Sequence, residues 1–158
     1  MKGLVDYINE AASIDDKITR ALKSKESFCL FCKQTKNNEN HLNHLVKNNG
    51  YDNVIRVYLD KAEPEDISGI PSKGGKIYPQ WMKEIIDNKN SQYVLVFCGE
   101  KKEFTSELYN ALMPIVLDND LGGKKCDNFI VCFSCTESLQ DDMPKPMKSR
   151  FAPNFFTV

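Results

Sequence analysis

The sequence predicts a single α/β domain, a three-layer sandwich in which helices cover both faces of a five-stranded parallel sheet. Short apolar runs recur along the chain, and the clearest of them is Tyr93–Phe97 (YVLVF). Segments with helical periodicity separate these runs, and that alternation is typical of βαβ units. Apolar runs without polar alternation indicate strands that are buried on both faces, as in a parallel sheet.

The individual elements can be placed in order along the chain. The expected strands are 27–31, 54–59, 93–97, 129–133 and 155–158. One or two helices are expected before Lys25, and others around 42–46, 79–86, 104–116 and 147–151. Asn49-Gly50 is a stop signal for the second helical segment, and Pro79 can begin the third. The segments 33–40, 61–76, 118–127 and 136–145 are expected to be loops, since they are polar or rich in glycine and proline.

The bulk composition favours a globular domain without a strong electrostatic partner. The chain has 158 residues, with 21 basic and 22 acidic residues and a net charge of -1. This balance gives no case for binding nucleic acid or an anionic membrane. No apolar run approaches the ~20 residues that span a bilayer, and the first residues are too polar for a signal peptide. We therefore expect a cytoplasmic, reducing location, in which the six cysteines are free thiols or metal ligands.

The central segment Ser91–Leu121 has the layout of a ligand-binding edge. Its apolar strand is followed by Cys98-Gly99-Glu100 and then by an amphipathic helix. In open α/β sheets, ligands bind outside the carboxyl ends of the strands. The turn that ends in Glu100 is therefore the first place to look for a functional site.

Four motifs give the chain a family resemblance over about 18–158. They are 63–71 (EPEDISGIP), 77–81 (IYPQW), 107–122 (ELYNALMPIVLDNDLG) and 141–151 (DDMPKPMKSRF). Their order and spacing resemble the MoxR-like branch of the AAA+ ATPases. The resemblance implies the core sheet of a phosphate-loop NTPase and ATP bound between neighbours in a hexameric ring. The chain ends at the fifth strand, so we expect one core domain over 1–158 without the family's helical lid.

The phosphate loop that this resemblance implies is degenerate. The family motif is G-x-x-x-x-G-K-[ST], whose glycines, lysine and hydroxyl hold the phosphates and Mg²⁺. The matching segment, 32–39, reads CKQTKNNE and lacks both glycines. Asn38 stands at the lysine position, and Glu39 stands at the hydroxyl position. If nucleotide binds, Lys33 and Lys36 are the cations left to contact phosphate.

The remaining family positions are partly altered. Gly99 stands where the family has the Mg²⁺-binding aspartate, and Glu100 stands where it has the glutamate that polarises water. The polar residue at the end of the fourth strand corresponds to Cys135 or Thr136. Thr136 is accordingly a candidate nucleotide contact. Arg150 matches the arginine finger that reaches the nucleotide of a neighbouring subunit, so the candidate catalytic residues are Glu100 and Arg150.

Two C-x-x-C pairs raise the question of a zinc site. They are Cys29/Cys32 and Cys132/Cys135. A four-cysteine zinc site needs both members of each pair on one turn. Both pairs lie on expected strands, where residues three apart face opposite sides of the sheet. We therefore expect Cys29 and Cys132 to be core packing.

A narrower thiol hypothesis concerns Cys32, Cys98 and Cys135, each of which falls at the carboxyl end of a strand. The family's sheet order makes those strands neighbours, so the thiols could converge on a redox or soft-metal site. The alternative is that three small buried residues fill a disused pocket. His41 and His44, one helical turn apart, could join a site near Cys32 or simply be exposed.

The leading hypothesis is a catalytically inactive AAA+-like domain that acts as a protein interaction or structural module. A protein partner or an AAA+ relative is then expected, with Arg150 acting in trans, and no cofactor or metal is expected. The alternative is an ATPase that binds ATP and Mg²⁺ through an atypical loop containing Lys33 or Lys36. The second alternative is the thiol site of Cys32, Cys98 and Cys135.

Overall fold

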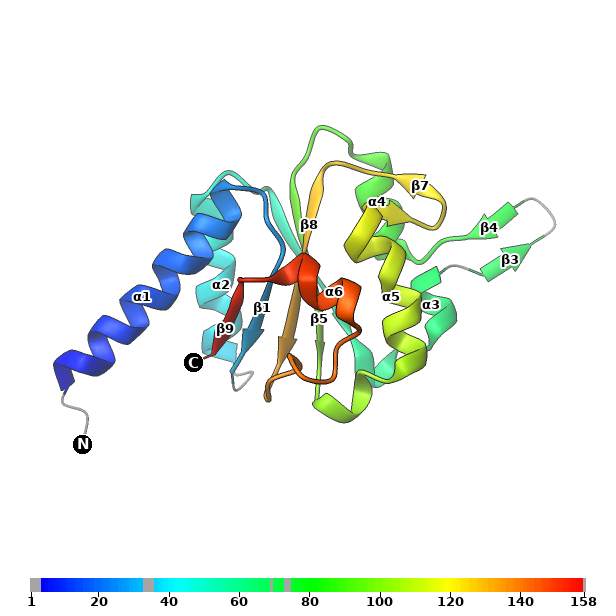
Figure 1. The fold of residues 1–158 in the computed structure, drawn as a ribbon. Helices are drawn as coiled ribbons and strands as arrows, with labels where there is room; N and C mark the ends of the chain where they lie inside the picture. The colour runs from blue at the N-terminus through cyan, green and yellow to red at the C-terminus, as the bar shows by residue number, and fades with distance from the viewer. Residues whose placement is uncertain (1–3, 33–35, 69, 73–74, 158) are drawn as a thin grey trace.

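The computed structural model shows an α/β sandwich built on one central sheet (Figure 1). It describes residues 4–32, 36–68, 70–72 and 75–157. For 4–13, 36–37, 70–72 and 75–76 it describes the backbone path alone. The central strands are β1 (Phe28–Phe31), β2 (Asn53–Tyr58), β5 (Tyr93–Gly99), β8 (Phe129–Cys135) and β9 (Phe155–Thr157). Their order is β2-β5-β8-β1-β9, and every neighbouring pair is parallel, which confirms the predicted sheet.

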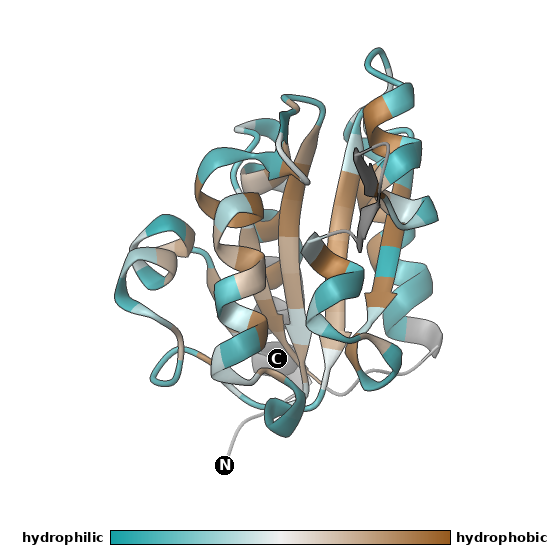
Figure 2. Cartoon of the chain, turned by 90° about the vertical axis from the view of Figure 1, so that its right-hand side faces the viewer, coloured by the Kyte–Doolittle hydropathy of each residue, from teal (hydrophilic) through white to brown (hydrophobic). Residues whose placement is uncertain are grey.

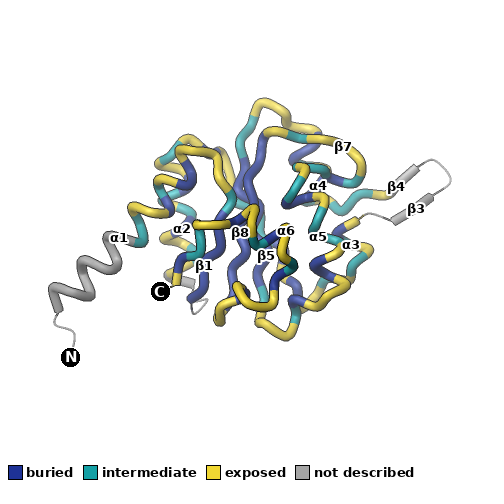
Figure 3. The backbone as a smooth tube through the Cα atoms, in the orientation of Figure 1, coloured by how far each residue is buried: buried dark blue, intermediate teal, exposed yellow. Residues whose placement is uncertain are grey.

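Helices cover both faces of this sheet, so the predicted three layers are confirmed. The helices are α1 (Leu4–Lys23), α2 (Lys36–Asn48), α3 (Pro64–Ser68), α4 (Gln80–Asp87), α5 (Ser106–Asp118) and α6 (Lys145–Phe151). The segment before Lys25 thus forms one helix. Helices α1 and α2 pack on one face, and α3 to α6 pack on the other. The buried residues line the sheet between the two helical layers (Figure 3).

Strand β5 is buried on both faces because its neighbours β2 and β8 flank it and helices cover it above and below. Its odd-numbered residues from Tyr93 to Phe97 pack in the core beneath α4 and α5. Its even-numbered residues from Val94 to Cys98 pack beneath α1 and α2. This is why the strand has no polar alternation. The hydropathy colouring shows the same contrast between apolar strands and polar outer helix surfaces (Figure 2).

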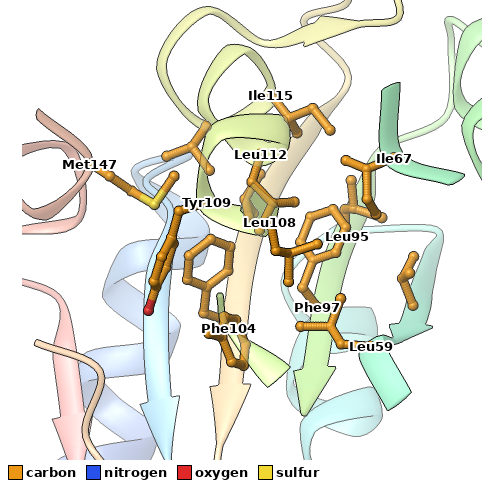
Figure 4. Close-up of a cluster of buried hydrophobic side chains, with 14 of the residues drawn as sticks. Leu59, Ile67, Leu95, Phe97, Phe104, Leu108, Tyr109, Leu112, Ile115 and Met147 are labelled. Atoms are coloured by element: carbon orange, nitrogen blue, oxygen red, sulfur yellow. The ribbon is translucent and has the colours of Figure 1, made fainter. Parts of the chain in front are cut away.

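A cluster of aromatic rings fixes the helical layer of α4 to α6 on the sheet. The ring of Phe133 lies 6.0 Å from that of Phe97, 5.5 Å from that of Phe104 and 4.8 Å from that of Phe151. Such pairs contribute about 0.5–1.5 kcal/mol each beyond the apolar area they bury. Phe97 and Phe104 lie beside the leucines of α5 in Figure 4. The cluster therefore ties the turn after β5 to β8 and to α6.

Two expected loops contain regular structure. Segment 61–76 was predicted to be a loop, but it includes α3 and the hairpin of β3 (Ile70–Ser72) and β4 (Gly75–Ile77), preceded by the 3-10 turn Leu59–Lys61. Helix α3 begins at Pro64 with two acidic residues in its first turn and buries only Ile67. A single buried residue gives no helical periodicity, so this prediction was wrong for a physical reason.

The second loop, 118–127, contains the hairpin of β6 (Asp120–Leu121) and β7 (Lys124–Lys125). Its turn is Gly122-Gly123, and both glycines have positive φ. The Tyr78 hydroxyl donates a hydrogen bond to the Gly122 carbonyl at 3.1 Å. The Lys124 ammonium lies 5.7 Å from the centre of the same ring. Tyr78 thus attaches the base of the β3–β4 hairpin to the β6–β7 hairpin.

Replacing Gly122 with alanine tests this attachment. An added Cβ at Gly122 would meet a Tyr78 ring carbon at 2.3 Å, whereas one at Gly123 would meet nothing. Both positions have positive φ, so Gly123→Ala is the matched control for backbone strain. We expect Gly122→Ala to lower the free energy of unfolding by roughly 1–3 kcal/mol more than the control, in urea denaturation. If the ring contact is the cause, the excess vanishes in a Tyr78→Ala background.

Candidate functional site

The candidate site is an open groove at the carboxyl edge of the sheet, with a volume of about 420 Å³. The lining residues are Tyr58, Asp60, Cys98, Gly99, Glu100, Lys102, Glu103 and Thr136. The groove lies where β2, β5 and β8 end, as expected for an open parallel sheet. Two of the predicted site residues, Glu100 and Thr136, therefore line one surface.

Glu100 is held by the tight turn that follows β5. The Glu103 carboxylate accepts a hydrogen bond from the Glu100 amide at 2.7 Å, which begins the 3-10 turn Lys101–Glu103. The Lys102 ammonium lies 3.2 Å from the Glu100 carboxylate, and the Glu100 side chain is 63% exposed. Its carboxylate thus has a neighbouring cation and no buried environment, whereas a general base is often tuned by burial.

Gly99 occupies the position at which the family resemblance implies a metal-binding aspartate. An added Cβ there would lie 3.2 Å from the Leu59 Cβ and 3.2 Å from the Glu103 carboxylate. A side chain at this position would therefore press on its neighbours. Leu59 and the flexible end of the Glu103 side chain would have to shift by a few tenths of an ångström to admit a larger side chain, and glycine itself offers no side-chain ligand. The residues present do not fit a Mg²⁺ site of the family type.

The segment matching the phosphate loop includes the start of a helix. Residues 33–40 were predicted to be a loop, but α2 begins at Lys36, so Asn38 and Glu39 lie in its first turns. Lys33 lies outside the described residues, and of Lys36 only the backbone is described. Asn38 is exposed, and the Glu39 carboxylate accepts a hydrogen bond from the Tyr58 hydroxyl at 3.3 Å.

Arg56 is the main residue of this region that the sequence reasoning missed. Its guanidinium donates to the Asn43 side chain at 2.9 Å and to the Glu39 carbonyl at 3.2 Å. These bonds fasten β2 to the side of α2. The signal was available, because Arg56 and Tyr58 are two residues apart and must share one face of a strand.

Charge around the groove is predominantly negative. Asp60, Glu100 and Glu103 line it, and Lys102 is the one cation among the lining residues that the structure describes. Lys101, the other cation of the turn, pairs with Asp142 at 3.3 Å, in the loop after β8. The described carboxylates of the groove would repel an anionic ligand such as a nucleoside triphosphate.

The three thiols do not converge, so that prediction was wrong. Cys32 and Cys98 lie in the core beneath α1 and α2, whereas Cys135 lies with Cys29 in the core beneath α5. Successive residues of a strand face opposite sides of the sheet. A cysteine that is shifted by one residue relative to a cysteine on the neighbouring strand therefore lies on the other side of the sheet. Across the described residues, no three histidine, cysteine or acidic side chains are placed to hold a metal ion. The expected split of each C-x-x-C pair is confirmed, since Cys132 packs with Cys32.

Burial makes these thiols poor nucleophiles. It raises the pKa of Cys98 to about 12, an effect that Arg56 opposes and Glu39 reinforces. Burial likewise raises the pKa of Cys32 and, against hydrogen bonds from the backbone of the following loop, that of Cys135. Because the thiolate is the reactive form, these groups are unreactive at neutral pH.

Arg150 lies far from Glu100 and Thr136. It is exposed on α6 and borders a pocket of about 390 Å³ with Ser27 and Phe129, which lie at the amino ends of β1 and β8. Parallel strands place their amino and carboxyl ends at opposite edges of a sheet. Arg150 therefore cannot meet a ligand in the groove of its own chain.

Of the two predicted histidines, His41 lines a pocket together with Cys32, but the described residues there do not form a metal-binding group. The His41 ring Nε2 lies 2.9 Å from the Asp15 carboxylate, which links α2 to α1, and His44 is exposed. None of the described helices is long and apolar enough to cross a membrane.

Comparisons with known proteins support the fold alone. No family model matches the sequence, and no curated protein matches it. Among solved structures, NtrX from Brucella abortus in complex with ADP is similar, with a TM-score of 0.63 and 13% identity over 100% of this chain and 36% of that chain. RuvB from Thermotoga maritima, a Holliday junction branch migration motor, has a TM-score of 0.55 and 11% identity over 100% of this chain and 48% of that chain.

The chain therefore spans less than half the length of either structural neighbour. Both neighbours are AAA+ phosphate-loop ATPases. The likeness covers the whole chain, and the five parallel strands match the sheet of these proteins. The protein thus has the α/β fold of the AAA+ phosphate-loop NTPase core.

Proposed function

We propose that this domain is a catalytically inactive AAA+-like module that acts through protein contacts rather than through ATP turnover. The observation that carries the proposal is the close packing around Gly99. A side chain at the position of the family's metal-binding aspartate would press on Leu59 and Glu103. In the neighbouring turn, the polar groups bind one another: Glu103 accepts a hydrogen bond from the Glu100 amide, and Lys102 pairs with the Glu100 carboxylate.

The electrostatics of the groove support the same proposal. Two unit charges of like sign at ~4 Å repel by about 4 kcal/mol at an effective dielectric near 20. Micromolar affinity amounts to only about 8 kcal/mol, so a few such contacts offset it. The groove offers three carboxylates, and the first turns of α2 add Glu39 where the family has a hydroxyl. Any single cation from the loop would compensate only part of this repulsion.

The exposed Arg150 suggests how such a module would engage a partner. Its position at the amino edge of the sheet separates it from the groove of its own chain. An arginine presented in this way suits a contact with a neighbouring subunit, including an active AAA+ relative that binds nucleotide. We further propose that the module is related to the MoxR-like branch of the AAA+ ATPases, because its sequence motifs resemble that branch.

The second candidate function is ATP binding, with or without hydrolysis. It is favoured by one observation, that Glu100 and Thr136 line the same groove at the edge where AAA+ nucleotides bind. The similar NtrX structures include complexes with ADP and with ATP. In this chain, Lys36 would have to supply the phosphate contact from the start of α2.

A thermal-shift titration with ATP and ADP, with and without Mg²⁺, separates the two candidates. A ligand at ~100 times its dissociation constant adds about 2.7 kcal/mol of stability, which moves the midpoint by several degrees. We expect millimolar nucleotide to move it by less than ~1 °C, because the groove repels phosphate. A larger Mg²⁺-dependent shift that Lys36→Ala abolishes would establish nucleotide binding instead.

ATP turnover should likewise be absent, and Glu100→Gln is the informative variant. If the module is inactive, phosphate release by the wild type and by Glu100→Gln will both equal the buffer rate, because Gly99 supplies no metal ligand. Lys102→Gln, which removes the cation beside Glu100, serves as the matched surface control. Turnover that the control retains and Glu100→Gln loses would contradict the proposal.

A pH titration tests whether the thiols are structural. Because the pKa of Cys98 is about 12 when folded and near 8.5 in an unfolded chain, the unfolded chain loses this proton first. The free energy of unfolding should therefore fall as pH rises from about 9 to 12, by up to ~1.4 kcal/mol per pH unit for this group. Urea denaturation across this range should show a shallower fall for Cys98→Ala. An unchanged slope, or rapid alkylation of native Cys98 at pH ~8, would contradict a buried neutral thiol.

A further inference from the structure

The pocket that Arg150 borders, at the amino edge of the sheet, has the size and position of a separate binding site. Its volume is about 390 Å³, within the range of roughly 300–1,000 Å³ that small-molecule pockets occupy. It spans the starts of three adjacent strands, because Ser27 precedes β1, Gln92 precedes β5 and Phe129 begins β8. It therefore lies at the opposite edge from the groove of Glu100, and an inference about it does not rest on the function proposed above.

Hydrogen bonds between separate elements hold the walls of this pocket in place. The Asn119 side-chain amide donates to the Phe129 carbonyl at 3.2 Å, which ties the end of α5 to the start of β8. The Ser27 hydroxyl accepts a hydrogen bond from the Val131 amide at 3.0 Å. The Asn154 side chain donates to the Ser27 carbonyl at 3.1 Å, which ties the segment after α6 to the start of β1. The pocket is therefore a fixed feature of the folded chain.

Four charged side chains line the pocket, two of each sign. Lys25 and Arg150 are cations, and Glu26 and Asp127 are acidic. None of the four forms an ion pair with another described residue. Opposite charges thus surround one cavity without meeting at contact distance. A ligand that carries both signs would pair with both kinds of group through charge-assisted hydrogen bonds.

The backbone conformation of Lys25 is a second, independent sign of use. Its φ is +54°, in the left-handed region, and the Glu26 amide closes α1 by donating to the Ala21 carbonyl at 2.9 Å. Glycine or asparagine usually fills such a position, because a Cβ is disfavoured there. Among the described residues other than glycine, Lys25 and Asn119 have positive φ, and both line this pocket. Strained residues of this kind cluster at functional sites.

We propose that this pocket binds a small zwitterion, a free amino acid or a short peptide, whose carboxylate pairs with Arg150 and Lys25 and whose ammonium pairs with Asp127. The guanidinium presents paired N–H donors that match the geometry of a carboxylate. Glu26 brings the net charge of the four lining groups to zero, which favours a ligand that is neutral overall over a phosphate or a polycation. The Gln92 side chain adds an amide that can donate to and accept from a peptide group.

The test titrates the full chain with the dipeptide alanylalanine and with two capped forms of it. The N-acetylated form lacks the ammonium, and the C-terminal amide lacks the carboxylate. Binding is followed by the NMR signals of the backbone amides, with each probe added up to about 10 mM so that millimolar affinities are measurable. We expect alanylalanine to shift the signals of Ser27 and Ile130. Each capped form should bind at least about fivefold more weakly, because one charge-assisted contact is lost.

Free L-alanine, titrated in the same way, distinguishes the two sources of this chemistry. Tighter binding of L-alanine than of alanylalanine identifies free amino acids as the ligand class, and the reverse order identifies short peptides. Either order supports a zwitterion site.

Variants of the charged lining test each contact separately. Arg150→Gln should weaken alanylalanine at least about fivefold and leave the amidated form, which has no carboxylate, unaffected. Asp127→Asn should show the reverse, with alanylalanine weakened and the acetylated form unaffected. Lys145→Gln, an exposed position on the same helix as Arg150 and outside the pocket lining, is the matched control and should change neither affinity.

Lys25→Gly separates a lost contact from a damaged fold. Glycine adopts positive φ without strain, so this variant should melt at a higher temperature than the wild type and yet bind alanylalanine more weakly. The proposal is overturned if no probe shifts a signal of the pocket at the highest concentration, or if the capped forms bind as tightly as alanylalanine. It is also overturned if Arg150→Gln binds alanylalanine as tightly as the wild type does. Nucleotide binding in the groove at the opposite edge would leave all of these outcomes unchanged.

Discussion

The constraint on which the rest of this structure depends is the burial of β5 on both faces. Its backbone must pair on both sides, so β8 lies beside it along its whole length and β2 lies beside it from Tyr93 to Cys98. The register places Val96 between Arg56 and Cys132, and Gly99 beside Cys135. Because the three strands are parallel, their carboxyl ends open onto one edge. The groove, its carboxylates and the close packing around Gly99 all follow from that pairing.

The same burial made the fold predictable from the sequence. A strand covered above and below must be apolar at every position, so YVLVF could be recognised without any structure. The two small hairpins could not be predicted in this way. Strands of two or three residues are too short to show an alternating pattern, and the glycines at Gly122-Gly123 in a polar stretch read as a loop. Helix α3 escaped notice because Ile67 is its one buried residue.

The sequence predicted where the candidate site residues lie in the fold, but it did not predict which groups they contact. Glu100 and Thr136 were placed correctly at the edge, because each follows the end of a buried strand. The cysteines show the limit of that reasoning, since moving one residue along a strand reverses the face. Cys98 and Cys135 end neighbouring strands and still point into different cores. The capping of Glu100 by Glu103 depends on the shape of a turn, which residue types alone do not determine.

Two sides of helix α2 make different contacts, one with β2 and the other with α1. Glu39 and Asn43, four residues apart, face β2 and bind Arg56. His41 and Leu45, also four residues apart, line a pocket between α2 and α1. Helix α2 packs on the sheet through the buried Leu42 and Val46, so the sheet fixes the positions of both of these sides.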